Sequence, residues 1–456
     1  MTDINKNSII ELDITDINNL GNGVGRIDGR VVFVRGAVSG DRVRAKVIKI
    51  NKSFIVARLE EILVSSVERD EGFCSAPLAC GGCVYRHIKY SHELELKYNY
   101  VKNSFIKAGI SDANVLPVIS AGRERAYRNK GQYPLTKIKG KTVAGFYASK
   151  THNVVPAENC AIQNPEFAPI LRLVCEIADE LSWSVYDEES GKGTLRHIYL
   201  RIGEKTGQIM LCLVINGKEP LHTDVLVERV KEKFPAVVSI ILNFNSEDTN
   251  VVLGEKYKIL YGKNGIEDEL CGLKFFISPA SFYQVNRDGA ELLYAKAREM
   301  AVLSGGETIA DLYCGTGTIG LSMARNSKRL CGIEIVESAV ECAKENAKNN
   351  GIDNAEFICG DASNKETILS AFGGVAPDVV VIDPPRKGST RELVDTLADI
   401  DVKKIVYVSC SPDTLARDAT YFLERGYEMG DVQPVDMFPR SGHVESVVCF
   451  KLQIQQ

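Results

Sequence analysis

Apolar and polar residues alternate along the first 64 residues in short runs that glycine-containing segments interrupt. Residues 8–14, 30–34, 41–50 and 53–59 are rich in β-branched side chains and have the two-residue period of strands buried on one face. The glycine-rich segment 21–25 and the Ser39-Gly-Asp sequence predict turns. Several short strands in so few residues predict a small β-barrel over residues 1–64, of the kind that binds oligonucleotides. A purely structural β-domain fits the same pattern.

The C-terminal part of the chain instead alternates between strand-like and helix-like segments. Apolar runs predict strands at residues 308–313, 332–336, 355–360, 378–383 and 404–410. A helical period over residues 337–349 lies between two of them. This alternation predicts a doubly wound, Rossmann-like α/β domain over residues 278–456.

Residues 65–277 mix both patterns and contain a cysteine-bearing loop followed by a helix predicted at residues 91–108. We expect a central α+β domain there. The fold class predicted for the whole chain is therefore multi-domain α/β, and a length of 456 residues agrees with two to four domains.

Composition narrows the class of protein. Hydrophobic residues make up 45% and charged residues 25% of the chain, values of a soluble globular protein. No run of about 18 apolar residues predicts a transmembrane helix, and the first residues lack the pattern of a secretory signal. We therefore expect a cytoplasmic protein without a membrane partner, and a monomer. Thirteen cysteines in a reducing compartment favour metal binding or chemistry over disulfides.

Charge is distributed unevenly. The net charge of −5 argues against general binding of polyanions. Residues 86–150 nevertheless contain 13 Lys and Arg against four Asp and Glu, a local charge of +9. Such a basic segment on an acidic protein indicates a face that binds phosphate; a solvated surface without a partner is the alternative.

A glycine-rich loop follows the first strand of the C-terminal domain. Gly315, Gly317 and Gly320 form a G-x-G-x-x-G pattern that opens a helix, where the backbone can approach an anionic or polar ligand closely. Glu334 ends the second strand, in position to accept the hydroxyls of a ribose, and Asp361 ends the third, in position to meet an adenine edge. The pattern predicts an adenosine-containing ligand and leaves open whether it is a dinucleotide or S-adenosylmethionine. A packing turn without a ligand is the alternative.

Two further strand ends carry groups that suit chemistry. Asp383 is held by two prolines, and the following Arg386 stands where methyltransferases of exocyclic amines place an aromatic residue, which argues against amine methylation. Cys410 lies between a strand end and a helix that begins at Ser411, and both neighbours favour a thiolate. A thiol with a pKa near ~7 would be half ionised at neutral pH. The alternative is an inert packing cysteine.

A thiolate is what methylation at carbon 5 of a pyrimidine requires. Addition of the sulfur to carbon 6 makes carbon 5 nucleophilic, and a base must then remove the carbon 5 proton so that the sulfur leaves. Glu445, which enters an apolar terminal strand, is the candidate base, because partial desolvation raises the proton affinity of a carboxylate. His443 ranks second, and a structural role for Glu445 is the alternative.

Four motifs together resemble one family. They are Asp311-Leu-Tyr-Cys-Gly-Thr-Gly, Asp383-Pro-Pro-Arg-Lys-Gly, Val408-Ser-Cys-Ser-Pro and Gly442-His-Val-Glu-Ser-Val. With the barrel and the cysteines, they resemble the bacterial 23S rRNA (uracil-5-)-methyltransferases that carry a TRAM barrel and an iron–sulfur cluster. The resemblance implies that Cys410 is the nucleophile and Glu445 the proton acceptor.

The resemblance also implies ligands. Its S-adenosylmethionine contacts fall on Gln284, Tyr313, Thr318, Glu334, Asp361 and Asp383. Thr318 departs from the family, in which asparagine is frequent, so the contact at the methionine end differs here. The expected partner is 23S rRNA, with the target uridine flipped out of folded RNA. The expected RNA contacts are Tyr127, Arg128, Lys130 and Gln132.

Four cysteines complete the resemblance, namely Cys74, Cys80, Cys83 and Cys160. Their spacing is close to that of ferredoxin-type clusters, zinc is the second choice for four thiolates, and unligated core cysteines are the third. The resemblance favours a [4Fe–4S] cluster. Other functions remain open on the sequence: a tRNA uracil-5 methyltransferase, a nicotinamide-dependent iron–sulfur oxidoreductase, and a non-catalytic RNA-binding protein.

Overall fold

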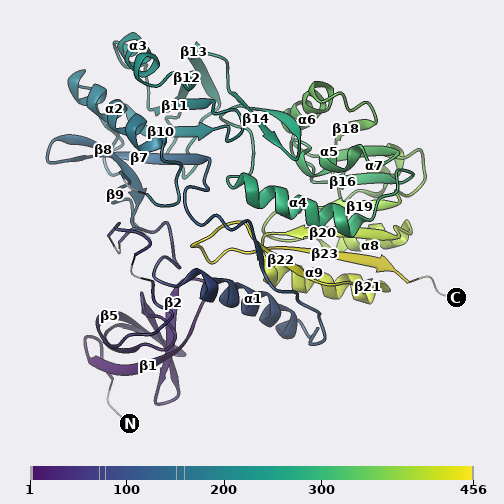
Figure 1. Ribbon diagram of the computed structural model, residues 1–456, viewed down its shortest axis with the longest axis horizontal. Coiled ribbons are helices and arrows are strands. Elements are labelled where there is room, and N and C mark those ends of the chain that lie inside the picture. Colours follow the sequence, from purple (N-terminus) through teal and green to yellow (C-terminus); the bar gives the residue numbers. More distant parts are fainter. Residues whose placement is uncertain (1–3, 71, 78, 150, 159, 454–456) are drawn as a thin grey trace.

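The computed structural model describes residues 4–70, 72–77, 79–149, 151–158 and 160–453. It places a β-barrel at the N-terminal end, a mixed sheet with two helices in the centre, and an α/β domain at the C-terminal end of the chain (Figure 1). Lys150, which contributes to the basic segment, lies outside the described residues. No helix among the described residues is long and apolar enough to cross a membrane.

The N-terminal barrel is closed, with the strand order β1-β2-β3-β5-β4. Its strands are β1 (Ile9–Ile17), β2 (Asn22–Ile27), β3 (Arg30–Arg35), β4 (Arg42–Ile50) and β5 (Phe54–Val64). Alternate residues point into one apolar core, as the two-residue period predicts.

The turn predicted at residues 21–25 is wrong, because most of this segment forms β2. Gly23 and Gly25 are needed for packing rather than for a turn. A Cβ on Gly23 would lie 2.9 Å from the side chain of Ala37, and one on Gly25 would lie 2.6 Å from the carbonyl oxygen of Asp13. The narrow barrel thus selects glycine where the chains approach closely.

The central domain is built on a seven-stranded sheet with the order β13-β12-β11-β10-β7-β8-β9. The strands are β7 (Lys130–Ile138), β8 (Lys141–Tyr147), β9 (Val154–Pro156), β10 (Leu195–Ile202), β11 (Ile209–Ile215), β12 (Val237–Phe244) and β13 (Lys256–Gly262). Two amphipathic helices, α2 (Phe167–Glu180) and α3 (Thr223–Lys233), pack on one face of this sheet and form one apolar core with it (Figure 1).

The C-terminal domain has a sheet of the order β18-β17-β16-β19-β20-β23-β22-β6, and β21 also pairs with β23. The strands are β16 (Thr308–Leu312), β17 (Arg329–Glu334), β18 (Ala355–Cys359), β19 (Val379–Ile382), β20 (Lys404–Ser409), β21 (Tyr427–Met429), β22 (Gln433–Asp436), β23 (Glu445–Leu452) and β6 (Ile119–Ser120). The strands β16 to β20 are parallel and β23 is antiparallel to β20. Each predicted strand of the doubly wound domain therefore exists, and each predicted carboxyl end lies within two residues of the observed one.

Helices cover both faces of this sheet, which confirms the α/β prediction. One face packs against α4 (Arg287–Ala301), α5 (Thr318–Ala324) and α6 (Glu337–Asn349). The other face packs against α1 (Tyr90–Lys107), α7 (Lys365–Ala371), α8 (Arg391–Asp399) and α9 (Pro412–Glu424). The bounds of α6 match the predicted helix at residues 337–349.

Three segments from the range predicted for the central domain pack with the C-terminal domain. Helix α1 lies against α9, and β6 adds a parallel strand beside β22. The hairpin of β14 (Ile266–Leu270) and β15 (Leu273–Ile277) shares the apolar core of α4. The chain thus crosses between the domains several times.

Candidate functional site

The carboxyl ends of four parallel strands meet at one edge of the C-terminal sheet. Tyr313, Glu334, Asp361 and Asp383 stand at or just beyond the ends of β16, β17, β18 and β19. Ligands of open α/β sheets bind at this edge, where the strand order reverses between β16 and β19. The structure therefore brings these four predicted cofactor residues to one crevice.

The glycine-rich loop is held against this edge by hydrogen bonds. The backbone N–H of Gly315 donates to Glu334 Oε2 over 3.1 Å, and the N–H of Val336 donates to Glu334 Oε1 over 3.0 Å. Gly317 precedes α5 with a φ of +80°, a conformation that favours glycine. Glu334 thus orders the loop and retains lone pairs on both oxygens for a ligand.

Asp311, at the start of the loop motif, is a functional candidate that the sequence reasoning missed. One of its oxygens, Oδ2, accepts the N–H of Gly320 over 2.9 Å, whereas the buried Oδ1 has no partner. Burial, and then the charges of Asp383 and Glu334, raise the pKa of Asp311 to about 7. Burial also raises the pKa of Asp383 to about 7. A crevice with several desolvated carboxyl groups fits a cationic ligand, because the cation offsets their mutual repulsion.

A buried tyrosine orients Thr318, the first residue of α5 after the glycine-rich loop. Tyr294 on α4 lies fully inside the core, and its hydroxyl oxygen is 3.0 Å from Oγ1 of Thr318. The side chain of Asn129 donates to the carbonyl oxygen of Gln284 over 2.9 Å, which fixes the loop before α4. Thr318 therefore has its hydroxyl already oriented, at the position where the sequence departs from the family.

Cys410 and Glu445 lie opposite each other on neighbouring strands. Ser409 pairs with Ser446 in the antiparallel ladder of β20 and β23, so the next position along places Cys410 opposite Glu445. Cβ atoms of directly opposite residues are about 4.5–5.5 Å apart. The two predicted catalytic residues are thus brought together although 34 residues separate them in the sequence, and Asp383 ends the strand on the other side of β20.

The charge state of Cys410 differs from the prediction. Burial, and then the negative charges of Glu445 and Asp383, raise the pKa of this thiol to about 11, and nearby Arg386 only partly offsets them. The expected thiolate is therefore not favoured in the free protein. The helix that begins after Ser411 does not outweigh two carboxylates at close range.

Glu445 is desolvated as predicted. Its side chain is 7% exposed, and burial together with Asp383 raises its pKa to about 8. A carboxyl group with this pKa is able to hold a proton at neutral pH and to exchange it. His443, the second candidate, lies two residues before Glu445 with its ring 6.1 Å from that of Phe438, and its pKa is lowered by partial burial and by Arg386.

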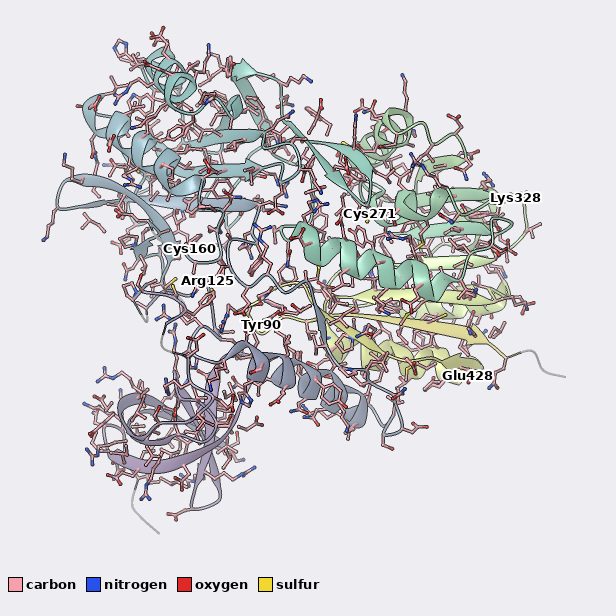
Figure 2. The ribbon with its side chains drawn as sticks, viewed as in Figure 1. Tyr90, Arg125, Cys160, Cys271, Lys328 and Glu428 are labelled. Atoms are coloured by element: carbon pink, nitrogen blue, oxygen red, sulfur yellow. The ribbon has the colours of Figure 1, made fainter. Side chains whose placement is uncertain are left out.

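The four predicted metal-binding cysteines line one cavity of about 510 Å³, together with residues of the central sheet such as Lys130, Gln132 and Phe146. Figure 2 shows Cys160 and Arg125 in this region. Burial, and then the proximity of Cys160, Cys74 and Cys80, raise the pKa of Cys83 to about 12, so that four thiolates here would need a compensating cation. Among the described residues, no three His, Cys, Asp or Glu side chains are drawn together as ligands of a single metal ion.

The predicted RNA contacts divide into two groups. Arg128, Lys130 and Gln132 line the same cavity as the cysteines. Tyr127 is only 1% exposed, and its hydroxyl donates to the carbonyl oxygen of Pro439 over 2.9 Å. Its ring packs with Phe73 and Ile162. Tyr127 therefore has no free face for RNA in this structure and acts in packing.

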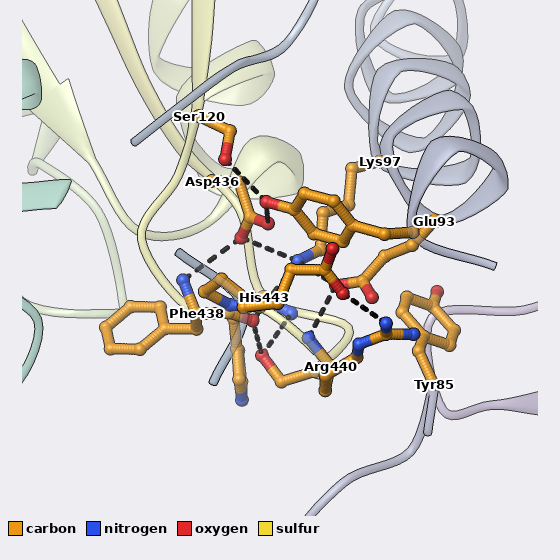
Figure 3. Close-up of polar contacts among 12 residues, drawn as sticks. Tyr85, Glu93, Lys97, Ser120, Asp436, Phe438, Arg440 and His443 are labelled. Atoms are coloured by element: carbon orange, nitrogen blue, oxygen red, sulfur yellow. Dashed lines mark hydrogen bonds and ion pairs between the residues drawn. The ribbon is translucent and has the colours of Figure 1, made fainter. Parts of the chain in front are cut away.

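The segment that leads into Glu445 is fixed by a buried ionic network (Figure 3). Lys97 of α1 donates from Nζ to Glu93 Oε1 and to Asp436 Oδ1, each over 2.7 Å. The backbone N–H of Arg440 donates to the same Glu93 oxygen over 2.7 Å. The Arg440 guanidinium lies 4.0 Å from the ring centre of Phe73, the residue before Cys74. Arg440 thus connects three parts of the structure: the loop that carries Cys74, helix α1, and the segment that leads into Glu445 and β23.

Comparisons with known proteins agree with this geometry. Residues 245–453 match the family model described as tRNA (Uracil-5-)-methyltransferase, and residues 5–59 match the TRAM domain. An uncharacterized RNA methyltransferase of Clostridium acetobutylicum is 44% identical over 451 residues, 98% of each chain. The chain belongs to the RNA (uracil-5-)-methyltransferase family. Another uncharacterized RNA methyltransferase, from Halalkalibacterium halodurans, is 41% identical over 99% of this chain and 98% of its own.

One solved structure resembles this protein over its whole fold. The tRNA (uracil-54, C5)-methyltransferase of Pyrococcus abyssi, in complex with S-adenosyl-L-homocysteine, superposes with a TM-score of 0.80 at 26% identity. The match covers 97% of this chain and all of that one. The protein is an RNA methyltransferase that uses S-adenosylmethionine, and the expected TRAM barrel and methyltransferase fold are confirmed.

Proposed function

We propose that this enzyme methylates carbon 5 of a uridine in 23S rRNA through a covalent adduct between Cys410 and carbon 6. The observation that carries the proposal is the register of β20 and β23, which sets the thiol of Cys410 opposite the buried carboxyl group of Glu445. A nucleophile and a proton acceptor on the same edge of the sheet as the glycine-rich loop are what this reaction requires.

The reaction uses the two residues in sequence. Cys410 releases its proton to solvent as Sγ bonds to carbon 6, and the electron pair of the 5,6 double bond moves to carbon 5. S-adenosylmethionine, when bound, supplies an electrophilic methyl group to that carbon. Glu445 acts in its ionised form: it takes the carbon 5 proton, the double bond re-forms, and the bond from Sγ to carbon 6 breaks, which leaves Cys410 as a thiolate.

The high proton affinity of Cys410 in the free protein makes its ionisation dependent on binding. Cys410 faces two carboxyl groups, Glu445 and Asp383, and each opposes a thiolate. A cationic ligand bound beside Asp383 would offset the negative charge of this carboxylate. The pKa of the Cys410 thiol would then fall. Arg386, whose positive charge acts to lower the pKa of both Cys410 and Glu445, favours the thiolate further.

The covalent mechanism is tested with two variants and labelled methyl donor. Cys410→Ala is expected to abolish transfer to RNA. Glu445→Gln is expected to accumulate a protein–RNA adduct that survives a denaturing gel, because the carbon 5 proton is no longer removed. Methyl transfer by Cys410→Ala, or the absence of any adduct with Glu445→Gln, would contradict this mechanism.

We choose 23S rRNA as the substrate because this chain carries both a barrel and a cysteine-lined cavity beside its catalytic domain. The 23S rRNA (uracil-5-)-methyltransferases that the sequence resembles combine the same features. A tRNA substrate is the second candidate, because the superposed Pyrococcus abyssi enzyme is named for tRNA. Transcripts of 23S rRNA and of total tRNA, incubated separately with the enzyme and mapped for 5-methyluridine, separate the two. Methylation of tRNA alone would overturn the rRNA assignment.

We further propose that Cys74, Cys80, Cys83 and Cys160 hold a [4Fe–4S] cluster, with zinc as the second choice. Their shared cavity and mutual repulsion as thiolates support a polycationic occupant. Bound iron would tie together the loops on either side of β7 and β8. Anaerobically purified protein is expected to contain about four irons and four sulfides per chain by cluster stoichiometry, and iron-free protein with stoichiometric zinc would reject the cluster.

The RNA contacts that the geometry supports are Arg128, Lys130 and Gln132. They lie beside the cysteines on the segment that enters the central sheet. Burial, and then the neighbouring cations Arg201 and Arg128, lower the pKa of Lys130 to about 8. A cluster of cations that repel one another is stabilised by phosphate, so replacement of Arg128 or of Lys130 by glutamine is expected to weaken RNA binding and to reduce its salt dependence.

A further inference from the structure

A second, smaller cavity lies in the central domain, distinct from the cofactor crevice and the cysteine cavity. Its volume is about 250 Å³. It is formed where β8 and β10 meet two loops, and it is lined by Tyr147, His152, Glu188, Arg196, His197 and residues 248–252. None of these residues is used by the proposed mechanism.

Two buried side chains of the lining have polar atoms for which the described part of the chain supplies no hydrogen-bond partner. His197 is 6% exposed and its Nδ1 has no hydrogen-bond partner. Arg196 is 4% exposed, and its Nε likewise has none. The remaining Arg196 bonds go to the carbonyl oxygens of Asn245 and Glu247, which fasten the loop that forms one wall. Unpaired buried polar atoms cost free energy, so a polar partner in the cavity would be stabilising.

The same cavity has aromatic walls. The ring centre of Tyr147 is 5.2 Å from that of His152 and 6.5 Å from that of His197, which stands edge-on to it. The Tyr147 hydroxyl donates to Glu188 Oε1 over 3.2 Å. On the loop opposite, Val251 is 64% exposed and offers an apolar surface. Flat rings with hydrogen-bonding groups at their edges suit a planar heterocycle.

Other classes of ligand fit less well. The one arginine among the lining residues, Arg196, already donates to two backbone carbonyl oxygens and lies 3.9 Å from Glu188, and the carboxylates of Glu188 and Asp248 oppose a phosphate group. Burial, and then the charge of Arg196, lower the pKa of His197 to about 4, so this ring adds no positive charge at neutral pH. Among the described residues, the histidines and acids of the cavity do not form a set that could hold a metal ion. A neutral aromatic ligand remains.

The position of the cavity connects it to the RNA-binding residues. In the β7–β10 ladder, His197 pairs with Pro134, Tyr199 with Gln132, and Arg201 with Lys130. On β10, His197 therefore lies four residues from Arg201, the residue that pairs with Lys130. Four residues span about 14 Å along a strand. A single-stranded nucleic acid that binds its phosphates near Lys130 reaches the cavity within a few nucleotides.

We propose that this cavity, defined by Tyr147, His152 and His197, binds one unpaired base of the substrate RNA outside the catalytic crevice. This inference rests on the proposed function, which supplies RNA as the ligand. Tyr147 and His152 stack on the base, and His197 with Glu188 contacts its polar edge. Glu188 accepts from an exocyclic amino group, which favours adenine, guanine or cytosine over uracil, since uracil has no amino group.

The test compares Tyr147→Ala and His152→Ala with a control, Tyr261→Ala. Tyr261 packs on the opposite face of the sheet, beside Lys231 of α3. Filter binding of a labelled 23S rRNA transcript, with S-adenosylhomocysteine binding as a check of folding, is expected to show about a 5- to 100-fold loss of RNA affinity for each cavity variant and little change for the control. The slope of affinity against salt should stay unchanged, since no phosphate contact is removed.

Photo-crosslinking of the wild-type enzyme to the same transcript gives an independent readout. A crosslinked nucleotide on residues 147–152 or 248–252 supports the cavity. Wild-type methylation of the transcript with unchanged affinity of both variants, and crosslinks only elsewhere, would overturn the cavity and leave the proposed function intact. A wild-type enzyme that binds and methylates tRNA instead would refute the rRNA assignment, and the same variants and crosslinks on tRNA then decide the cavity.

Discussion

Replacement of Glu445 by glutamine is expected to stabilise the protein at neutral pH while it removes the proton acceptor. The cause is the burial of a carboxyl group next to Asp383, which raises the pKa of Glu445 from an ordinary 4.5 to about 8. A glutamine has almost the same shape and no charge to desolvate. The gain in stability should therefore depend on pH in a way that identifies its origin.

The sign follows from proton uptake. Below pH 4.5 the carboxyl group is protonated in both the folded and the unfolded chain, so the substitution changes little. Between pH 4.5 and about 8 the folded chain keeps the proton and the unfolded chain has released it, so the free energy of unfolding falls as pH rises, by about 1.4 kcal/mol per pH unit. At pH 7 the accumulated cost is about 3 kcal/mol, and glutamine does not have it.

The assay is thermal denaturation of both proteins between pH 5 and pH 8. For a domain of this size about 3 kcal/mol corresponds to a rise in Tm of roughly 6–12 °C at pH 7, and the difference should shrink to about 1–3 °C at pH 5. Glu428→Gln is the matched control, because this glutamate is exposed on β21, the strand beside β23 (Figure 2), and should change Tm little at any pH.

Added cofactor sharpens the test. S-adenosylmethionine carries a cationic sulfonium, so its binding should reduce the difference between wild type and Glu445→Gln more than the neutral S-adenosylhomocysteine does. A Glu445→Gln protein that is less stable than the wild type at pH 7, or a difference that does not vary with pH, would refute the reasoning that Glu445 is a desolvated carboxyl group.

Three other substitutions or modifications probe the site. Alkylation of Cys410 by iodoacetamide at pH 9 should be slow in the free wild-type protein and faster in Glu445→Gln, measured by mass spectrometry, because one negative charge beside the thiol is gone; equal rates would show that the two groups do not interact. Lys97→Met should lower the free energy of unfolding by about 3–5 kcal/mol, because two buried carboxylates lose their shared cation. Lys102 is exposed on the same helix, and Lys102→Met should change the free energy of unfolding by less than about 1 kcal/mol. Equal effects of the two substitutions would show that the buried network does not stabilise the fold. Tyr294→Phe should weaken S-adenosylhomocysteine binding about two- to tenfold by calorimetry; unchanged affinity would remove this tyrosine from cofactor positioning.

The sequence by itself determined the parts of the site that follow from local pattern. The glycine-rich loop, the acids at the ends of β17 and β18, and Cys410 at the end of β20 were predictable because parallel strands in such a sheet all present their carboxyl ends to one edge. The strand limits and helix α6 follow from hydrophobic periodicity, which reflects only which residues within a segment are buried.

Only the tertiary structure decided what depends on neighbours that are distant in the chain. The high pKa of Cys410 comes from Glu445 and Asp383 on flanking strands, and no local rule about helix ends reveals it. Tyr127 stands in a basic segment and yet is buried against Phe73, since the loop before Glu445 covers it. The base-binding cavity is likewise assembled from segments separated by up to a hundred residues. Burial and charge–charge distance are properties of the folded arrangement, so these features became visible only once the strands were in register.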